Sequence, residues 1–152
     1  MENSLDELDR KILSIISQNA RKPFSEIAEV CGVSRAAVHQ RVQKMFDNGT
    51  LLGSGYQVNP QHLGFNLCAY VGLMLDTGKA YNSVSKELES IPEVVESVFT
   101  LGAYGMMVKL YARDNAHLLH LLNDKLLSIP HVMNTETLAI LDQKISRPLP
   151  IL

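Results

Sequence analysis

Apolar residues in the first 50 positions recur at intervals of three and four, a spacing that predicts amphipathic α-helices. The first helix has an apolar face made of Leu5, Leu8, Ile12, Ile15 and Ile16, and it ends before Pro23. A short second helix is predicted from about Ser25 to Gly32. The third begins after Ser34 and has the apolar stripe Val38, Val42, Met45 and Phe46. A turn of about three residues with a glycine separates the last two helices, which is typical of a helix-turn-helix.

The pattern changes after residue 50. Residues 51–66 contain Gly53, Gly55 and Pro60 and predict a connecting strand and linker. Beyond them, apolar runs and helical periodicity alternate. They predict strands at 67–75, 94–101, 105–112 and 132–141 and helices at 80–91 and 114–129. This β-α-β-β-α-β order is that of a ferredoxin-like domain, with an antiparallel sheet and both helices on one face. The apolar sheet face left uncovered favours dimerisation.

Charge is distributed unevenly along the 152 residues, although the formal net charge is only -2. Residues 10–46 carry seven basic side chains, Arg10, Lys11, Arg21, Lys22, Arg35, Arg41 and Lys44, against the two acids Glu26 and Glu29. A local basic patch suits a polyanionic partner better than the overall charge suggests. An ordinary solvated face is the alternative.

The outward side of the third helix suggests which polyanion. At 100° per residue, Ala36, Ala37, Gln40, Gln43 and Lys44 face away from the core, flanked by His39 and Arg41. Small alanines allow close approach, glutamine suits adenine, and arginine or lysine suits guanine or phosphate. No acid occurs in residues 32–45. The predicted contacts to double-stranded DNA are Arg21, Lys22, Ser34, Arg35, Ala36, Ala37, His39, Gln40, Arg41, Gln43 and Lys44. A polar surface helix in a three-helix bundle is the alternative, and Arg41 on the flank could instead brace the fold.

Several segments together resemble the Lrp/AsnC family of bacterial and archaeal transcription regulators. They are LDELDRKIL (5–13), NAR (19–21), GVSRAAVHQRV (32–42), HLGF (62–65), TLGAYG (100–105) and NTETLAIL (134–141). VHQRVQKM (38–45) and the pair Arg147-Pro148 are closest to the asparagine-responsive AsnC-type branch. The resemblance implies an α+β chain with a helix-turn-helix (winged-helix-like) DNA-binding domain at 1–50. The linker would be 51–66, and a ferredoxin-like effector-binding and oligomerisation domain would cover 67–152.

The resemblance also implies an effector and an assembly. Family members dimerise through the sheet, and their dimers associate further, commonly into octamers. Their amino-acid ligands bind between dimers near the Gly-rich turn, here Leu101, Gly102, Ala103, Tyr104 and Gly105, with Thr135 and Thr137 expected close by. Asparagine is the first candidate.

Gly105 departs from the family pattern, because many members have an aspartate at this position. The ligand's ammonium group would therefore need a carbonyl, or an acid such as Asp124 or Glu136, while glycine-flanked N–H groups receive its carboxylate. The alternative is that the two glycines only permit a tight hairpin.

Other chemistry is not indicated. The sequence has no P-loop, GxGxxG, HExxH or nucleophile elbow, so an enzyme is not expected. His117, His120 and Asp124 lie near one helical face, but Leu121 and Leu122 intervene, which favours a core or interface border with weak pH sensitivity over a metal site. We expect neither metal nor cofactor.

The compartment and the function follow from the same features. The acidic N-terminus is no signal peptide, the apolar run 67–75 is too short for a membrane, and two lone cysteines suggest a reducing compartment. The expected protein is a cytoplasmic regulator that acts at the nucleoid, binds DNA sequence-specifically and responds to an effector. The alternatives are an effector-free architectural nucleoid protein and a ligand-binding or enzymatic ferredoxin-like domain.

Overall fold

The computed structural model describes residues 5–151. These residues divide into two compact units, one made of residues 5–57 with 145–151 and the other of residues 58–144. Residues 145–151 therefore belong by their contacts to the helical unit, whereas the sequence analysis assigned them to the second domain. The physical reason is apolar packing, because Ile151 contacts the core of the helical unit.

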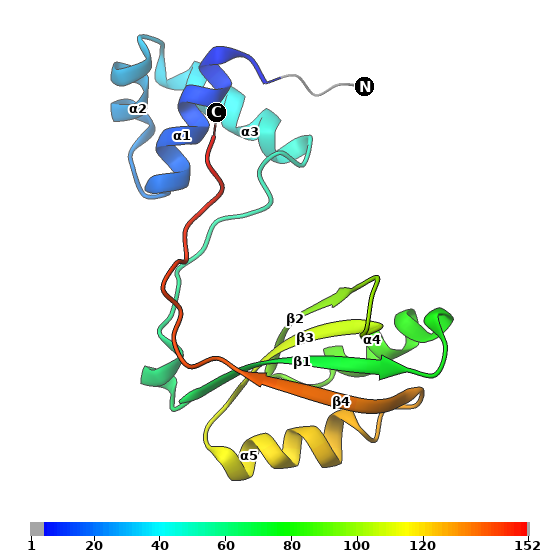
Figure 1. Ribbon diagram of the computed structural model, residues 1–152. Coiled ribbons are helices and arrows are strands. Elements are labelled where there is room, and N and C mark those ends of the chain that lie inside the picture. The colour runs from blue at the N-terminus through cyan, green and yellow to red at the C-terminus, as the bar shows by residue number, and fades with distance from the viewer. Residues whose placement is uncertain (1–4, 152) are drawn as a thin grey trace. The chain divides into compact units, whose positions relative to one another are not determined.

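The helical unit consists of α1 (Glu7–Gln18), α2 (Phe24–Cys31) and α3 (Arg35–Asp47), shown in Figure 1. A capping box starts α1, in which the Asp6 carboxylate accepts the Asp9 N–H at 2.7 Å and the Asp9 carboxylate accepts the Asp6 N–H. Gly32, at φ 68°, ends α2 in a left-handed conformation. The Ser34 hydroxyl then caps α3 by accepting the Ala37 N–H at 3.1 Å. Both the short turn and the cap follow the sequence prediction.

The core of this unit is formed by one face of each helix. Its buried apolar residues are Ile12, Leu13, Ile27, Ala28, Val38, Val42 and Met45. Phe46, predicted in the buried stripe, is 40 % exposed, because at 100° per residue it falls on the flank of the face formed by Val38, Val42 and Met45.

The strand predicted within 51–66 was wrong. Residues 51–59 form no regular secondary structure, and a single 3-10 turn at Pro60–Leu63 follows. A strand needs a neighbour for its backbone N–H and C=O groups, and residues 52–59 are exposed instead. Within residues 5–57 the helical unit therefore contains no strand that would form a wing.

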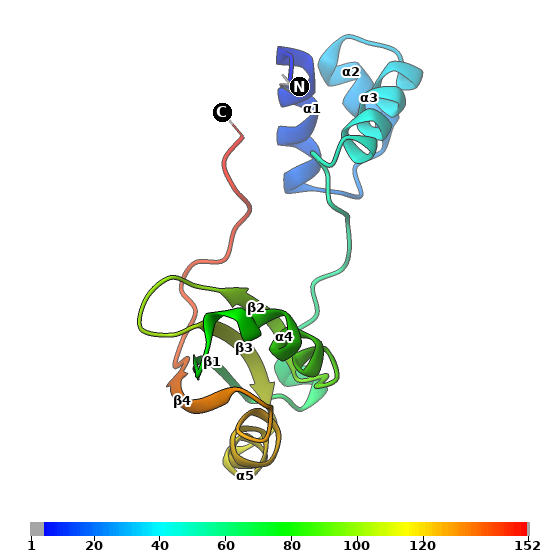
Figure 2. The ribbon, with the colours of Figure 1, turned by 90° about the vertical axis from the view of Figure 1, so that its right-hand side faces the viewer.

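The second unit has the predicted β-α-β-β-α-β order. Its elements are β1 (Leu67–Leu75), α4 (Tyr81–Glu89), β2 (Val94–Phe99), β3 (Met106–Ala112), α5 (Asn115–His120) and β4 (Val132–Ala139). The strands pair antiparallel in the order β2-β3-β1-β4. The single helix predicted at 114–129 needs correction. It consists of α5, which ends at His120, and of a π-helical segment at Leu121–Leu126 that follows directly. In both views α5 lies along one side of the sheet, and the loop between β2 and β3 lies away from α5 (Figures 1 and 2).

Both helices cover one face of the sheet. The core on that face comprises Ala69, Val71 and Leu73 of β1, Met106, Val108 and Leu110 of β3, Val84 and Leu88 of α4, and Leu121 and Leu126 of the π-helical segment. The alternate residues of the strands form the open face, defined here by Tyr70, Gly72, Val98, Lys109, Glu136 and Leu138. Tyr70, Val98 and Leu138 are all exposed on it.

Among residues 5–151, no helix is long and apolar enough to cross a membrane.

Candidate DNA-binding surface and effector region

The outward face of α3 is polar and accessible. Val38, Val42 and Met45 are buried, whereas Arg35, Ala36, His39, Gln40, Gln43 and Lys44 are exposed and Ala37 is partly so. The predicted orientation of the helix is therefore confirmed, and contact of these residues with DNA stays a prediction. Ser34 caps α3, and the first turn of the helix has no acidic side chain. A helix N-terminus without acids is a suitable setting for a phosphate oxygen.

Arg41 lies in a different setting from the rest of the predicted DNA-contacting set. Its Nη1 atom is 2.5 Å from Oδ2 of Asp6 and 2.7 Å from Oδ1 of Asp9. The Asp9 side chain is only 11 % exposed. Hydrogen bonding to the Arg41 guanidinium is the main cause that lowers the pKa of Asp6 below 3.8, and the same bonds raise the pKa of Arg41. Arg41 thus ties α3 to the capping box of α1, which is the bracing role that the sequence left open.

Two other residues of this face have contacts within the chain. The Gln43 side-chain amide donates to Oδ1 of Asp47 at 2.8 Å, one turn along α3. The His39 ring packs edge-on against Phe24 of α2, with ring centroids 6.0 Å apart. Gln43 would have to release Asp47 to bind a base, whereas the Gln40 amide has no such side-chain contact among residues 5–151.

The turn between α1 and α2 carries Arg21 and Lys22. Oδ1 of Asn19 accepts the backbone N–H of Arg21 at 3.0 Å, and the carbonyl of Asn19 accepts the N–H of Lys22 at 3.1 Å. The guanidinium carbon of Arg21 lies 4.3 Å from the ring centroid of Tyr56, in the segment after α3. Sequence reasoning missed Tyr56, although a lone aromatic in a glycine-rich linker is a usable signal.

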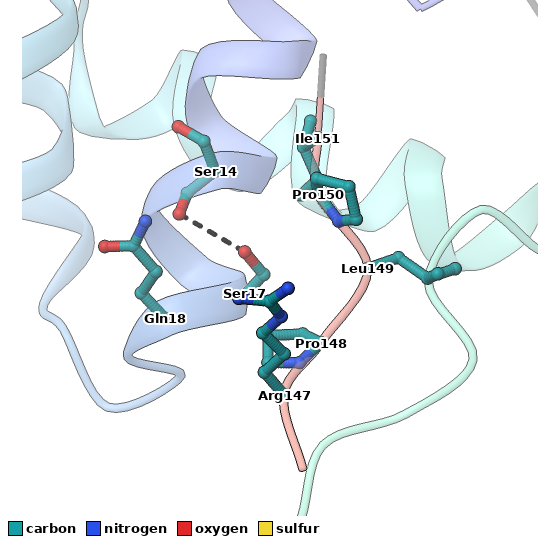
Figure 3. A pocket seen from close by; sticks show the side chains of 8 residues that line it. All are labelled: Ser14, Ser17, Gln18, Arg147, Pro148, Leu149, Pro150 and Ile151. Atoms are coloured by element: carbon teal, nitrogen blue, oxygen red, sulfur yellow. Dashed lines mark hydrogen bonds between the residues drawn. The ribbon is translucent and has the colours of Figure 1, made fainter. Parts of the chain in front are cut away.

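The C-terminal segment forms a groove with α1, which sequence reasoning also missed. The groove has a volume of about 500 Å³ and is lined by Ser14, Ser17, Gln18 and residues 147–151 (Figure 3). The Ser14 and Ser17 hydroxyls donate to helix carbonyls at Lys11 and Ser14, as Figure 3 shows for the second bond. Ile151 packs on the helical core beside this groove, while Leu149 is 87 % exposed.

The Gly-rich turn joins β2 to β3 and is closed by hydrogen bonds. Oγ1 of Thr100 donates to the Tyr104 carbonyl at 2.7 Å, and the Thr100 N–H donates to the Gly105 carbonyl at 3.1 Å. The Gly105 N–H is already used, because it donates to the Leu73 carbonyl at 2.9 Å. Leu101, Gly102 and Ala103 are exposed, with Gly102 at φ 151°. Gly105 therefore serves the hairpin through its backbone. Within this turn, the groups left for a ligand are those of the exposed tip and of Tyr104.

Tyr104 crosses the open face from this turn to β4. Its ring lies over Gly72, so that a Cβ atom at position 72 would be 2.5 Å from the Tyr104 ring. Gly72 is the register partner of Glu136 on β4. A hydrogen bond with the Glu136 carboxylate is the main cause that raises the pKa of the Tyr104 hydroxyl above 10.0. The structure thus joins two of the predicted effector residues.

The other predicted effector residues lie elsewhere. Thr135 and Thr137 pair with Leu73 and Val71, so their side chains lie on the helix-covered face rather than beside Glu136. Asp124 is in the π-helical segment, where Oδ2 lies 2.7 Å from Nδ1 of His120. The predicted effector residues therefore do not form one cluster within this chain.

His117, His120 and His131 contact separate acids. Nε2 of His117 lies 3.3 Å from Oε1 of Glu93, and Nδ1 of His131 lies 3.1 Å from Oδ1 of Asp76. Within residues 5–151, no group of three or more His, Cys, Asp or Glu side chains is arranged to hold a metal ion.

Comparison with known proteins accounts for both units. The AsnC-type helix-turn-helix domain matches residues 5–45, and the Lrp/AsnC ligand binding domain matches residues 68–150. The chain is 38 % identical over 148 residues to the regulatory protein AsnC of Escherichia coli, covering 97 % of each. The solved structure of Escherichia coli AsnC matches with a TM-score of 0.90 and 36 % identity, over 96 % of this chain and 98 % of that one.

A transcriptional regulator from Neisseria meningitidis, solved as a complex with L-methionine, shares the fold. It matches with a TM-score of 0.89 and 21 % identity over 97 % of both chains. The capped α3, with no acid in its first turn and a glycine turn before it, agrees with the antiparallel ferredoxin-like sheet and with the two matched domains. The chain belongs to the Lrp/AsnC family of transcription regulators.

Proposed function

We propose that this regulator binds operator DNA through α3 and that an amino acid changes its DNA binding or its assembly. The observation that carries the proposal is the outward face of α3, which is accessible and has no acid in its first turn, while Ser34 caps the N-terminus of the helix. A major groove admits one helix, which reads bases mainly through its N-terminal residues. The proposed place of action is therefore the nucleoid, where the operator DNA lies.

The residues of this surface have different proposed tasks. Arg21, Lys22, Arg35 and Lys44 contact phosphates and set affinity, while Ala36, Ala37 and Gln40 face base edges and set sequence choice. The test is selection of bound fragments from a random duplex pool. Gln40→Ala should relax the preference at one base position and leave the salt dependence unchanged. Lys44→Ala, the matched variant one turn along, should weaken all duplexes and reduce the salt slope by about 1. Equal losses from Gln40→Ala on selected and random DNA would refute base reading by this residue.

The effector is proposed to be an amino acid, with asparagine as the first candidate. Support comes from the matched ligand-binding domain, and from the related regulator solved with L-methionine. Glu136 offers an acceptor for a ligand ammonium, the function that Gly105 lacks. Thermal shift against the common amino acids is the test. A ligand at 100 times its Kd stabilises the native state by about 2.7 kcal/mol. A shift with none of them would reject the amino-acid effector.

The open face of the sheet is the proposed dimer surface, and four dimers would make an octamer. Tyr70 lies near its middle, between Lys109 of β3 and Leu138 of β4. A glutamate there would place an added charge near the centre of the interface, where it would lose water on association. Tyr70→Glu should therefore sediment as a smaller species than the unaltered protein, with unchanged circular dichroism. An unchanged sedimentation coefficient would exclude this face.

An effector-free architectural role is the second candidate. Gly105 favours it, since this position supplies no side-chain acceptor to a ligand and its N–H is occupied by the Leu73 carbonyl. Competition with random DNA separates the two roles. An architectural protein would release random and genomic fragments at the same concentration of competitor DNA. Amino acids would not change its binding to either kind of fragment.

A further inference from the structure

Tyr56 is an exposed aromatic residue with a defined contact. Its side chain is 79 % exposed, and it follows α3 in a segment that has no regular secondary structure. The Arg21 guanidinium lies over its ring at 4.3 Å from the centroid, well within the range of a cation–π interaction. Both residues belong to the helical unit, so the contact lies within one compact body.

Arg21 is held at both ends by this arrangement. Its backbone N–H donates to Oδ1 of Asn19, which fixes the turn from which the side chain starts. Its guanidinium carbon lies over the Tyr56 ring, and a guanidinium on an aromatic face can still donate its edge N–H groups to a phosphate. Among residues 5–151, the structure gives Arg21 no carboxylate within salt-bridge distance. The charge is therefore oriented but not neutralised.

We propose that Tyr56 is a positioning residue that presents Arg21 to the phosphate backbone of bound DNA. A free arginine loses rotamer freedom when it binds a phosphate, and a pre-stacked one has already lost much of it. Tyr56 itself makes no phosphate contact in this proposal. The inference rests on the proposed DNA binding of this chain and deepens it by linking the segment after α3 to affinity.

The experiment uses the full chain and a short random-sequence duplex, because a phosphate contact does not depend on base sequence. Fluorescence anisotropy gives Kd over a series of salt concentrations. Tyr56→Leu should raise Kd by about 2- to 5-fold, the range expected for an exposed cation–π contact. Tyr56→Phe keeps the aromatic face and should restore the affinity. Leu52→Ser, a change at another exposed apolar residue of the same segment, serves as the control.

A double-mutant cycle decides whether Tyr56 acts through Arg21. In an Arg21→Ala background, Tyr56→Leu should have no further effect on Kd, and Arg21→Ala should lower the salt slope by about 1. An equal loss from Tyr56→Leu with and without Arg21 would overturn the inference. So would an unchanged Kd for Tyr56→Leu. Failure of the unaltered protein to bind any duplex at low salt would instead refute the proposed DNA binding.

Discussion

The ring of Tyr104 rests directly on the backbone of Gly72, which has no side chain to keep it away. A Cβ atom at position 72 would lie 2.5 Å from Cδ1 and 2.6 Å from Cγ of this ring. These atoms are close to the Tyr104 backbone, so a small rotation of the side chain cannot relieve the overlap. Gly72 thus permits a turn residue to reach across β1 to β4.

Gly72→Ala should therefore displace Tyr104. We expect a loss of about 1–3 kcal/mol in the free energy of unfolding, the usual cost of an overpacked site. Urea unfolding followed by circular dichroism measures it. The double variant Gly72→Ala with Tyr104→Ala should show a smaller loss than the sum of the single changes, because the overlap is gone. Additive losses would contradict the contact.

The hydroxyl of Tyr104 should ionise at an unusually high pH. A hydrogen bond with the Glu136 carboxylate favours the protonated phenol and raises its pKa above 10.0. The protonated phenol is favoured in the folded protein, so its contribution to stability is present below pH 10.0 and is lost as pH rises through the folded pKa. Titration of the tyrosine Cζ signals by NMR measures this, with Tyr104→Phe to assign the resonance.

Glu136→Gln is the matched variant for that titration. It keeps the shape of the side chain but removes the charge, so the pKa of Tyr104 should move back toward 10.0. Thr135→Ser changes the neighbouring residue on the other face and should leave the titration unaltered. An unmoved Tyr104 signal in Glu136→Gln would show that another group raises the pKa.

Local signals in the sequence predicted much of the fold. The turn around Gly32 and the cap at Ser34 are set by neighbouring residues, and the helices appeared at the expected positions. The strand predicted within 51–66 failed because a strand depends on a partner that local pattern does not reveal. The sequence periodicity of Leu121–Leu126 is that of an ordinary helix, so the local pattern did not reveal the π-helical segment found there.

The candidate sites were predictable only in part, for the same reason. Gly72 appears in the sequence as a small residue in a strand, and nothing near it points to Tyr104. Thr135, Glu136 and Thr137 were grouped by sequence, but the alternation of a strand separates the two threonines from the glutamate. The ion pairs of Arg41 with Asp6 and Asp9 bridge more than 30 positions. Such contacts follow from the tertiary fold alone.

Arg41→Met should destabilise the helical unit and change its acid sensitivity. Loss of the charged hydrogen bond to Asp9 should cost about 1–2 kcal/mol near neutral pH. Asp6 has a pKa lowered below 3.8, so its contribution is present above that value and is lost as pH falls through the folded pKa. The difference between Arg41→Met and the unaltered protein should thus shrink below pH 3.8. Thermal melts across acidic pH measure it.

Arg35→Met is the control for that series. Arg35 is exposed at the start of α3, and no salt bridge joins it to an acid within residues 5–151. Its replacement should leave the melting temperature nearly unchanged at every pH, while weakening DNA binding if it contacts phosphate. A pH-independent loss in Arg41→Met would mean that the methylene stem of Arg41, rather than its charge, stabilises the unit.

The C-terminal segment should stabilise the helical unit through one side chain. Ile151 packs on the core formed by the three helices, whereas Leu149, two residues earlier, is 87 % exposed. Pro148 and Pro150 restrict the backbone on either side of Leu149, which reduces the entropy lost when the segment docks. Ile151→Ser should therefore lower the free energy of unfolding by about 1–2 kcal/mol and speed amide hydrogen exchange in α1.

Leu149→Ser is the matched control for this contact, because it removes a similar apolar side chain from the same segment. We expect it to change the free energy of unfolding by no more than about 0.5 kcal/mol and to leave the exchange of α1 amides unaltered. Faster exchange confined to α1 in Ile151→Ser alone would establish that residues 147–151 dock on this helix. Equal effects of the two substitutions, or none from either, would show that the segment does not hold α1 in solution.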